Sequence, residues 1–294
     1  METYQYRKID AFTSENSLGN PAVCIYLEEN QSLTDTEMLA IAKQHYGFVS
    51  EVVYCKQKSQ ADYHLTYYSS ECEVDFCGHG TIACMSDLIM ETPYLMTQKE
   101  ITIQTNKKGS LNVYNEIQSQ GSVYITAPIP QYIKAAPNAK SIAENLGFRS
   151  GQISDTFPIE VIDAGLKTLI VPISALNDEI NVFPNEQTLK EFCITADIDI
   201  TLIYSLEVAD NHNIAHTRVF APKFGYLEDP ATGSGNSAFG YYMLKNGLWD
   251  GKPVSVEQGG ADRVFNSVKL QYKDGNVLFG GGATKRIEGV YYHW

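Results

Sequence analysis

Positive charge is scarce in this 294-residue chain, which has 22 lysines and arginines against 35 aspartates and glutamates, a formal net charge of −13. Because binding to a phosphate backbone needs clustered lysine and arginine, this balance argues against a nucleic-acid partner. The sequence also lacks a run of 18 apolar residues, so no membrane span is expected. Its first residues contain no apolar segment of the kind found in secretion signals. We therefore expect a cytoplasmic protein.

Patterns typical of zinc and nucleotide sites are missing as well. The six cysteines form no CxxC pair, and the six histidines are too scattered to predict a metal cluster. We interpret the cysteines as free thiols, because a chain of this size does not need disulfides. No stretch reads GxxxxGK[ST], and no GxGxxG links a strand to a helix. The sequence therefore predicts no metal, nucleotide or flavin cofactor.

Apolar residues make up 44% of the chain and charged residues 19%, so a large core can be buried. The length fits two domains, and most segments read as strands separated by turns. Residues 127–138 hold three prolines and mark a boundary. We predict an N-terminal domain over 1–127 and a C-terminal domain over 128–282, with residues 283–294 returning to the first domain as a last strand.

Two glycine-rich segments resemble each other at a separation of 155 residues. CGHGTIA (77–83) aligns with TGSGNSA (232–238) at both glycines and at the alanine, and Glu73 and Glu228 stand four residues before each start. An apolar helical segment and then a strand-like segment follow both. We interpret this as an internal duplication. It predicts an α+β fold of two similar domains, each a mostly antiparallel sheet wrapped around one central helix.

Each repeated segment is expected to begin a helix. The first turn of a helix has unpaired backbone N–H groups and a partial positive charge, so it attracts carboxylate or phosphate. Glycines at 78, 80, 233 and 235 would let a ligand approach these amides closely. We expect the two helix starts to hold one small anionic molecule in a cleft between the domains.

Several motifs resemble those of PhzF-like proteins, isomerase-like enzymes that take their name from phenazine biosynthesis and have the diaminopimelate epimerase fold. The resemblance runs along the whole chain. The segments that carry it are DAFTSENSLGNPAVCIYL (10–27), GFVSEVVYC (47–55), EVDFCGHGTIA (73–83), TRVFAP (217–222), GYLEDPATGSG (225–235) and VEQG (256–259).

The resemblance implies a role for each matching residue. Glu51 would be the acid–base group that moves a proton on the substrate. His79 would hydrogen-bond a substrate hydroxyl or carboxylate, Asp229 would hold an amino group or hydroxyl, and Ser234 would hold a polar substituent. The Gln-Gly turn at 258–259 would line the rim. A carboxyl group in a water-poor cleft suits the central role, because desolvation lets it take and return a proton near neutral pH.

Each of these residues also has a purely structural interpretation. Glu51 could pair or cap at a strand start, and His79 could be solvated and idle in the first turn of a helix. Asp229 could simply favour the positive end of the helix dipole. Ser234 could be the helix cap.

Cys77 departs from the usual PhzF-like pattern, in which a small residue such as alanine is common before Gly-His. Epimerases and racemases of the same fold carry a catalytic cysteine there and a second one in the other domain. A thiol at a helix N-terminus tends to be reactive. The partner position here is Thr232, whose hydroxyl is too weak a base for two-thiol racemisation. A dehydratase that uses one cysteine opposite a threonine stays open, as does a small buried hydrophobe.

Three functions remain as hypotheses. The first is a cofactor-independent isomerase in which Glu51 moves a proton on a small carboxylate-bearing substrate. The second is a Cys77-dependent epimerase or dehydratase, and the third is a non-enzymatic protein that binds a small metabolite. The resemblance also implies a homodimer. Nothing in the sequence links the chain to phenazine synthesis itself.

Overall fold

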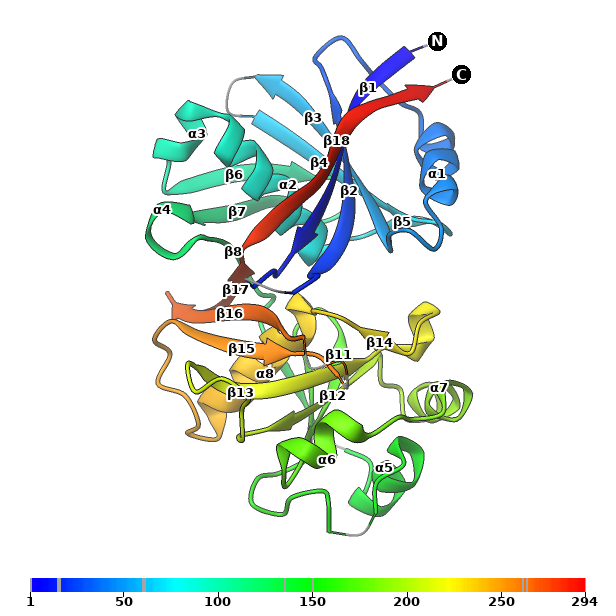
Figure 1. The fold of residues 1–294 in the computed structure, drawn as a ribbon, viewed down its shortest axis with the longest axis vertical. Helices are drawn as coiled ribbons and strands as arrows, with labels where there is room; N and C mark the ends of the chain where they lie inside the picture. Colours follow the sequence, from blue (N-terminus) through cyan, green and yellow to red (C-terminus); the bar gives the residue numbers. More distant parts are fainter. Residues whose placement is uncertain are drawn as a thin grey trace. The chain divides into compact units, whose positions relative to one another are not determined.

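The chain is described by a computed structural model that covers residues 2–14, 17–59, 62–134, 136–149, 151–260, 262 and 264–293. It divides into two compact units (Figure 1). The first unit consists of residues 1–126 and 280–294, and the second of residues 127–279. Among the described residues, no helix has the length and apolar character needed to cross a bilayer.

The first unit combines a long mixed sheet with short helices. Its strands are β1 (Glu2–Ala11), β2 (Asn20–Leu27), β3 (Glu51–Ser59), β4 (Asp62–Ser69), β5 (Glu73–Val74), β6 (Glu100–Thr105), β7 (Gly109–Glu116), β8 (Ser122–Thr126) and β18 (Ala283–His293). Its helices are α1 (Asp35–Gln44), α2 (Gly78–Glu91), α3 (Pro93–Thr97) and α4 (Ile117–Gln120).

The second unit has the same kind of architecture. Its strands are β9 (Gln131–Ile133), β10 (Glu160–Asp163), β11 (Lys167–Pro172), β12 (Ile200–Ser205), β13 (Asn213–Phe220), β14 (Glu228–Asp229), β15 (Val254–Gln258) and β16 (Asn266–Lys273). Its helices are α5 (Ala139–Leu146), α6 (Leu176–Asn181), α7 (Glu186–Thr195), the 3-10 helix η1 (Pro222–Phe224) and α8 (Gly233–Lys245). Strand β17 (Asn276–Gly281) runs from the second unit into the first.

Strand pairing repeats between the two units. In the first, β1 pairs β2 antiparallel, β2 pairs β3 parallel, β3 pairs β4 antiparallel, and β4 pairs β5 antiparallel and β6 parallel. In the second, β10 to β15 repeat this series pair by pair. The sixth strand then pairs antiparallel with a seventh in both units. The predicted α+β fold with two pseudo-repeated domains is thus confirmed, and most of its strand pairs are antiparallel.

The duplicated segments begin the central helix of each unit. Helix α2 follows the short strand β5, and helix α8 follows its counterpart β14. Both helices are buried along most of their length, as an apolar helix enclosed by its own sheet must be. A side chain at Gly233 would not fit, because an added Cβ would lie 2.2 Å from Cε2 of Phe279.

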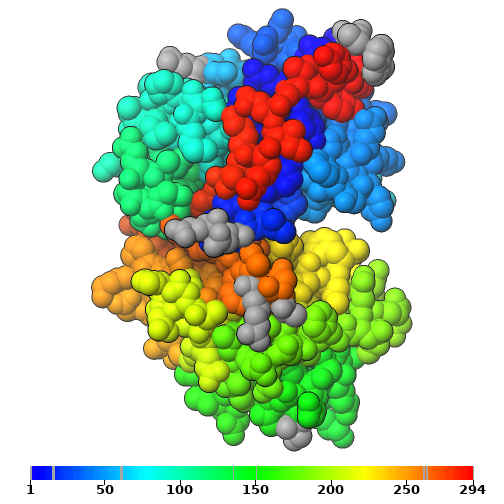
Figure 2. All heavy atoms as spheres, in the orientation of Figure 1, coloured from blue at the N-terminus to red at the C-terminus, as the bar shows by residue number. Residues whose placement is uncertain are grey.

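Two further features of the first unit are the cap of helix α1 and the pairing of strand β18 with β1. Helix α1 begins with a capping box, in which Thr34 accepts a hydrogen bond from the backbone N–H of Glu37 and the Glu37 carboxylate accepts one from that of Thr34. Strand β18 pairs antiparallel with β1 from Glu2–His293 to Ala11–Ala283, so both ends of the chain belong to one sheet. Figure 2 shows β18, in red, on the surface of this unit beside the blue N-terminal segment.

Candidate functional site

Glu51 is the first residue of β3, where it pairs with Ala22 of β2 and Ser69 of β4. Its side chain is 19% exposed, so part of it still reaches solvent. The oxygen Oε2, however, is buried and has no hydrogen-bond partner within the described residues. Because an unpaired buried carboxylate oxygen is unfavourable, this atom is ready to interact with a proton, a ligand or an ion.

Cys77 and His79 stand at the start of α2. Cys77 is the N-cap residue, and its Sγ accepts a hydrogen bond from the backbone N–H of Gly80 at 3.3 Å. This close approach requires glycine, because a Cβ at position 80 would lie 2.7 Å from Cγ2 of Val53 and 3.0 Å from Sγ of Cys77. The glycine-rich sequence therefore places a buried thiol and an imidazole on the same helix turn.

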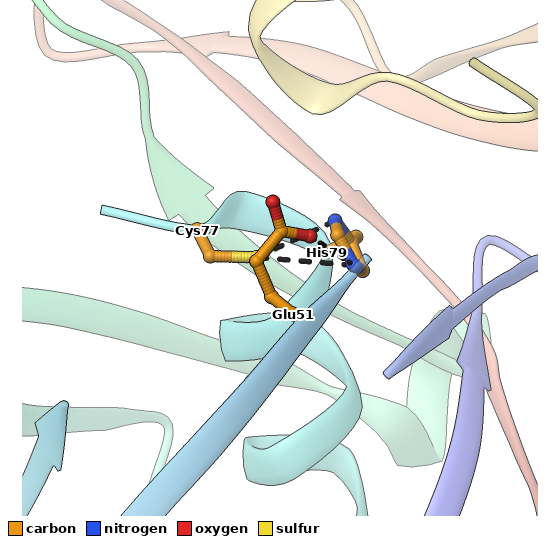
Figure 3. A group of neighbouring side chains, drawn as sticks. All are labelled: Glu51, Cys77 and His79. Carbon is orange, nitrogen blue, oxygen red and sulfur yellow. Dashed lines mark hydrogen bonds and ion pairs between the residues drawn. The ribbon is translucent and has the colours of Figure 1, made fainter. Parts of the chain in front are cut away.

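The fold brings Glu51, Cys77 and His79 together (Figure 3). Nε2 of His79 lies 3.4 Å from Oε2 of Glu51, within ion-pair range but longer than a normal hydrogen bond. Sγ of Cys77 lies 3.4 Å from Nδ1 and 3.8 Å from Nε2 of the same imidazole. One donor atom from each of the three side chains lies within 4.8 Å of the other two. A base, an imidazole and a thiol thus share one small volume.

Burial sets the charge state of His79. It lowers the pKa of the imidazole below 6.5, because the charged form loses hydration. The negative charge of Glu51 and the backbone carbonyl of Pro21 oppose this shift without cancelling it. At neutral pH, His79 is therefore neutral, with one nitrogen that donates a hydrogen bond and one that accepts.

The second unit carries the corresponding helix start. Thr232 is the N-cap of α8, and among the described residues its side chain makes no capping hydrogen bond to the first turn. The suggestion that Ser234 caps the helix is therefore wrong, because Ser234 is the second residue of α8 and is partly exposed. Unlike the Gly80 amide, which is used by the Cys77 thiol, the amides of Gly233 and Gly235 have no side-chain cap in this turn.

Asp229 and Gln258 shape the loop before α8. Asp229 lies in β14, is partly exposed, and accepts a hydrogen bond from the backbone N–H of Ala231 at 3.2 Å. Gln258 donates to the Asp229 carbonyl and to Thr232 Oγ1, and it accepts from the Thr232 backbone N–H and from the Asn236 side chain. Gln258 is fully buried, so the expectation that it lines a rim is wrong. It fixes the loop instead.

The sequence did not predict that Gln258 fixes the loop before α8 through hydrogen bonds, or that Asn236 donates one of them. The only signal was the Gln-Gly turn itself, since the contacts depend on the parallel pairing of β13 with β15, which sets Gln258 beside Thr217. The predicted residues fall into two groups: Glu51, Cys77, His79, Gly78 and Gly80 lie in the first unit, and Asp229, Ser234, Gly233 and Gly235 in the second.

Comparison with solved structures places this architecture in a class. The chain superposes on a probable proline racemase from Agrobacterium radiobacter K84 with a TM-score of 0.60 at 10% identity, covering 99% of this chain and 93% of that one. This likeness concerns the fold alone. A duplicated sheet-and-helix scaffold with a glycine-rich helix start in each half therefore defines a protein of the racemase and epimerase fold.

The family follows from sequence. The family model described as phenazine biosynthesis-like protein, PhzC-PhzF, matches residues 9–289, and the chain belongs to this family. The uncharacterized isomerase YfhB of Bacillus subtilis is 29% identical over 262 residues, 88% of this chain and 87% of that protein. A PhzF family protein of Bacillus anthracis is 25% identical, with a TM-score of 0.84 and full coverage of both chains. The predicted family and the class of isomerase-like enzyme are confirmed.

Proposed function

We propose that the protein is an isomerase in which the carboxyl group of Glu51 removes a proton from one carbon of a small carboxylic acid and returns it to another. The observation that supports this is the position of Glu51, whose buried Oε2 has no hydrogen-bond partner among the described residues and lies 3.4 Å from a partly buried imidazole. Proton transfer by a well-placed side chain accelerates a reaction about 100- to 10,000-fold. The overall change is redox neutral, so the proposed step includes no redox cofactor.

His79 would orient the substrate in this mechanism. A neutral imidazole can donate a hydrogen bond to a substrate hydroxyl or carboxylate and accept one from Glu51 when that carboxyl carries the proton. The lowered pKa of His79 supports this role, because a protonated imidazole would hold Glu51 as an ion pair and weaken it as a base.

The second unit would bind the polar groups of the substrate. The amides at Gly233 and Gly235 suit a carboxylate, because the first turn of α8 lacks a side-chain cap. Asp229 suits an amino group or hydroxyl, and Ser234 suits a further polar substituent. Gln258 acts as a positioning residue, since its hydrogen bonds fix the loop that carries Asp229.

The test is hydrogen exchange in heavy water. The protein is incubated with a panel of small unsaturated, hydroxy and amino carboxylic acids, cyclic and acyclic, and proton NMR follows loss of C–H signal and appearance of the isomer. Glu51→Gln should lower the exchange rate at least about 100-fold. Glu100→Gln, a change at the exposed first residue of another strand, should leave it intact. Equal exchange by wild type and Glu51→Gln would refute the proposal.

A second candidate is an epimerase or dehydratase that depends on Cys77. The observation in its favour is the 3.4 Å separation between Sγ and Nδ1 of His79, which places a base next to the thiol. In this case Cys77→Ala abolishes exchange while Glu51→Gln is tolerated. The reverse pattern supports Glu51 as the base.

We also propose that the chain forms a homodimer. Strand β18 exposes the apolar side chains of Ile287, Val290 and Tyr292, each close to half exposed or more. Light scattering coupled to size exclusion should give twice the 32.7 kDa mass of the chain, and Val290→Lys should shift it towards the monomer.

A further inference from the structure

The cluster formed by Glu51, Cys77 and His79 contains three different metal-binding groups. A carboxylate, a thiol and an imidazole each contribute one donor atom, and these atoms lie within 4.8 Å of one another. Cys77 is 5% exposed, and the side chains of His79 and Glu51 are 12% and 19% exposed. The three groups are therefore largely shielded from water, and an ion can still enter from solvent.

The separations fit a tetrahedral zinc ion. Zinc lies about 2.0 to 2.3 Å from nitrogen, oxygen and sulfur ligands, so two ligands of one tetrahedron stand about 3.3 to 3.8 Å apart. Nε2 of His79 lies 3.4 Å from Oε2 of Glu51 and 3.8 Å from Sγ of Cys77.

The surroundings provide a second argument for a cation. Oε2 of Glu51 is buried without a hydrogen bond, although His79 is close. A bound cation would satisfy this oxygen, and the N–H of Gly80 that points at Sγ favours the thiolate a metal needs. The sequence gives no sign of such a site, because one ligand comes from β3 and the other two from the start of α2.

We propose that Glu51, Cys77 and His79 bind one Zn²⁺ ion through a carboxylate oxygen, Sγ and a ring nitrogen, with a fourth position open to water. Binding releases the thiol proton of Cys77 to solvent. The consequence for activity rests on the proposed function: an ion that occupies the Glu51 carboxylate blocks its proton transfer. Zinc is therefore a reversible inhibitor of the isomerase, and a chelator restores activity.

The experiment measures binding directly, by calorimetric titration of the full chain with ZnSO₄ after treatment with a chelator and a thiol reductant. Absorption during titration with Co²⁺ reports a thiolate ligand through its charge-transfer band. One ion per chain is expected. Cys77→Ser should weaken binding about 100-fold, while serine still caps α2. Cys72→Ser makes the same chemical change at an exposed thiol and should bind as wild type does.

His79→Ala serves as a second ligand variant, and circular dichroism checks that both variants are folded. Absence of a one-to-one Zn²⁺ complex, or equal affinity in wild type and Cys77→Ser, would overturn the proposal. The consequence for activity is tested as the ratio of exchange rates with and without Zn²⁺ at about 100 times the wild-type Kd, which should be about 0.01 for wild type and about 0.5 for Cys77→Ser.

The two proposals fail in different ways. If Glu51→Gln abolishes exchange but no zinc binds, the metal site is wrong and the isomerase stands. If zinc binds through Cys77 but no carboxylic acid exchanges its hydrogens, the metal site stands and the isomerase is wrong.

Discussion

Replacing His216 with asparagine should change the way in which the stability of the second unit depends on pH. His216 of β13 and Glu179 of α6 are completely buried, and Nδ1 lies 3.1 Å from Oε1. Burial, aided by the positive charge of Arg218, lowers the pKa of His216 from 6.5 to about 3. Burial also raises the pKa of Glu179 well above 4.5, against the opposing effect of Arg218 and with support from Glu257 and Glu228. Both shifts favour the neutral forms of the pair in the folded protein.

The sign follows from proton counting. Below pH 6.5 the unfolded chain protonates His216 and the folded chain does not, so acid favours unfolding until about pH 3. Taken alone, the titration of His216 lowers the free energy of unfolding by up to about 1.4 kcal/mol per pH unit, which gives about 2 kcal/mol between pH 6.5 and pH 5. Asparagine does not titrate. As the pH falls from 6.5 to 5, the free energy of unfolding of His216→Asn should therefore rise by about 2 kcal/mol relative to that of wild type.

Urea denaturation followed by tryptophan fluorescence measures this difference, because Trp249 is buried in the same unit. The control is His212→Asn, which makes the same change at an exposed histidine just before β13. Glu179→Gln should show the opposite trend, gaining stability over wild type as the pH rises above 4.5. A difference between His216→Asn and wild type that stays constant from pH 6.5 to 5 would refute the reasoning.

Three further predictions concern packing and access. Gly233→Ala should destabilise the protein by about 1 to 3 kcal/mol in thermal denaturation, because its Cβ would lie 2.2 Å from Phe279. Gly289→Ala should have little effect, because a Cβ added there would meet no described atom within 4 Å beyond its chain neighbours, and equal losses in the two variants would contradict this. Gln258→Ala should lower the free energy of unfolding by at least about 2 kcal/mol, measured by urea denaturation. The reason is that the buried backbone N–H of Thr232 and the side-chain amide of Asn236 lose the oxygen to which they donate. Iodoacetamide should label exposed Cys72 first, and peptide mass spectrometry that finds another cysteine labelled first would be inconsistent with the burial described above.

Local sequence signals predicted the parts of the fold that depend on neighbouring residues. The alignment of 77–83 with 232–238 located the starts of both central helices, which begin at Gly78 and Gly233. The repeated strand pairing then follows, because similar sequences fold into similar sheets. Both helix starts can be located from local sequence, because they require glycine where the backbone approaches another side chain closely and apolar residues along the helix that follows.

Contacts between distant residues could not be predicted in this way. Glu51 was selected through a resemblance, and its distance from His79 depends on how β3 pairs with β2 and β4 and on where α2 starts. The buried pair of His216 and Glu179 was missed, because the polar segment of α6 reads as a solvated helix turn. Burial of such groups is decided by tertiary packing rather than by local pattern.

The ladder between β1 and β18 has a consequence for how the protein is made. A ribosome releases β1 long before β18, so β1 lacks its β18 partner until residues 127–279 have been translated. Residues 127–279 emerge earlier as one continuous stretch. The middle of the chain can therefore mature before its beginning, which reverses the usual N-to-C order of co-translational folding.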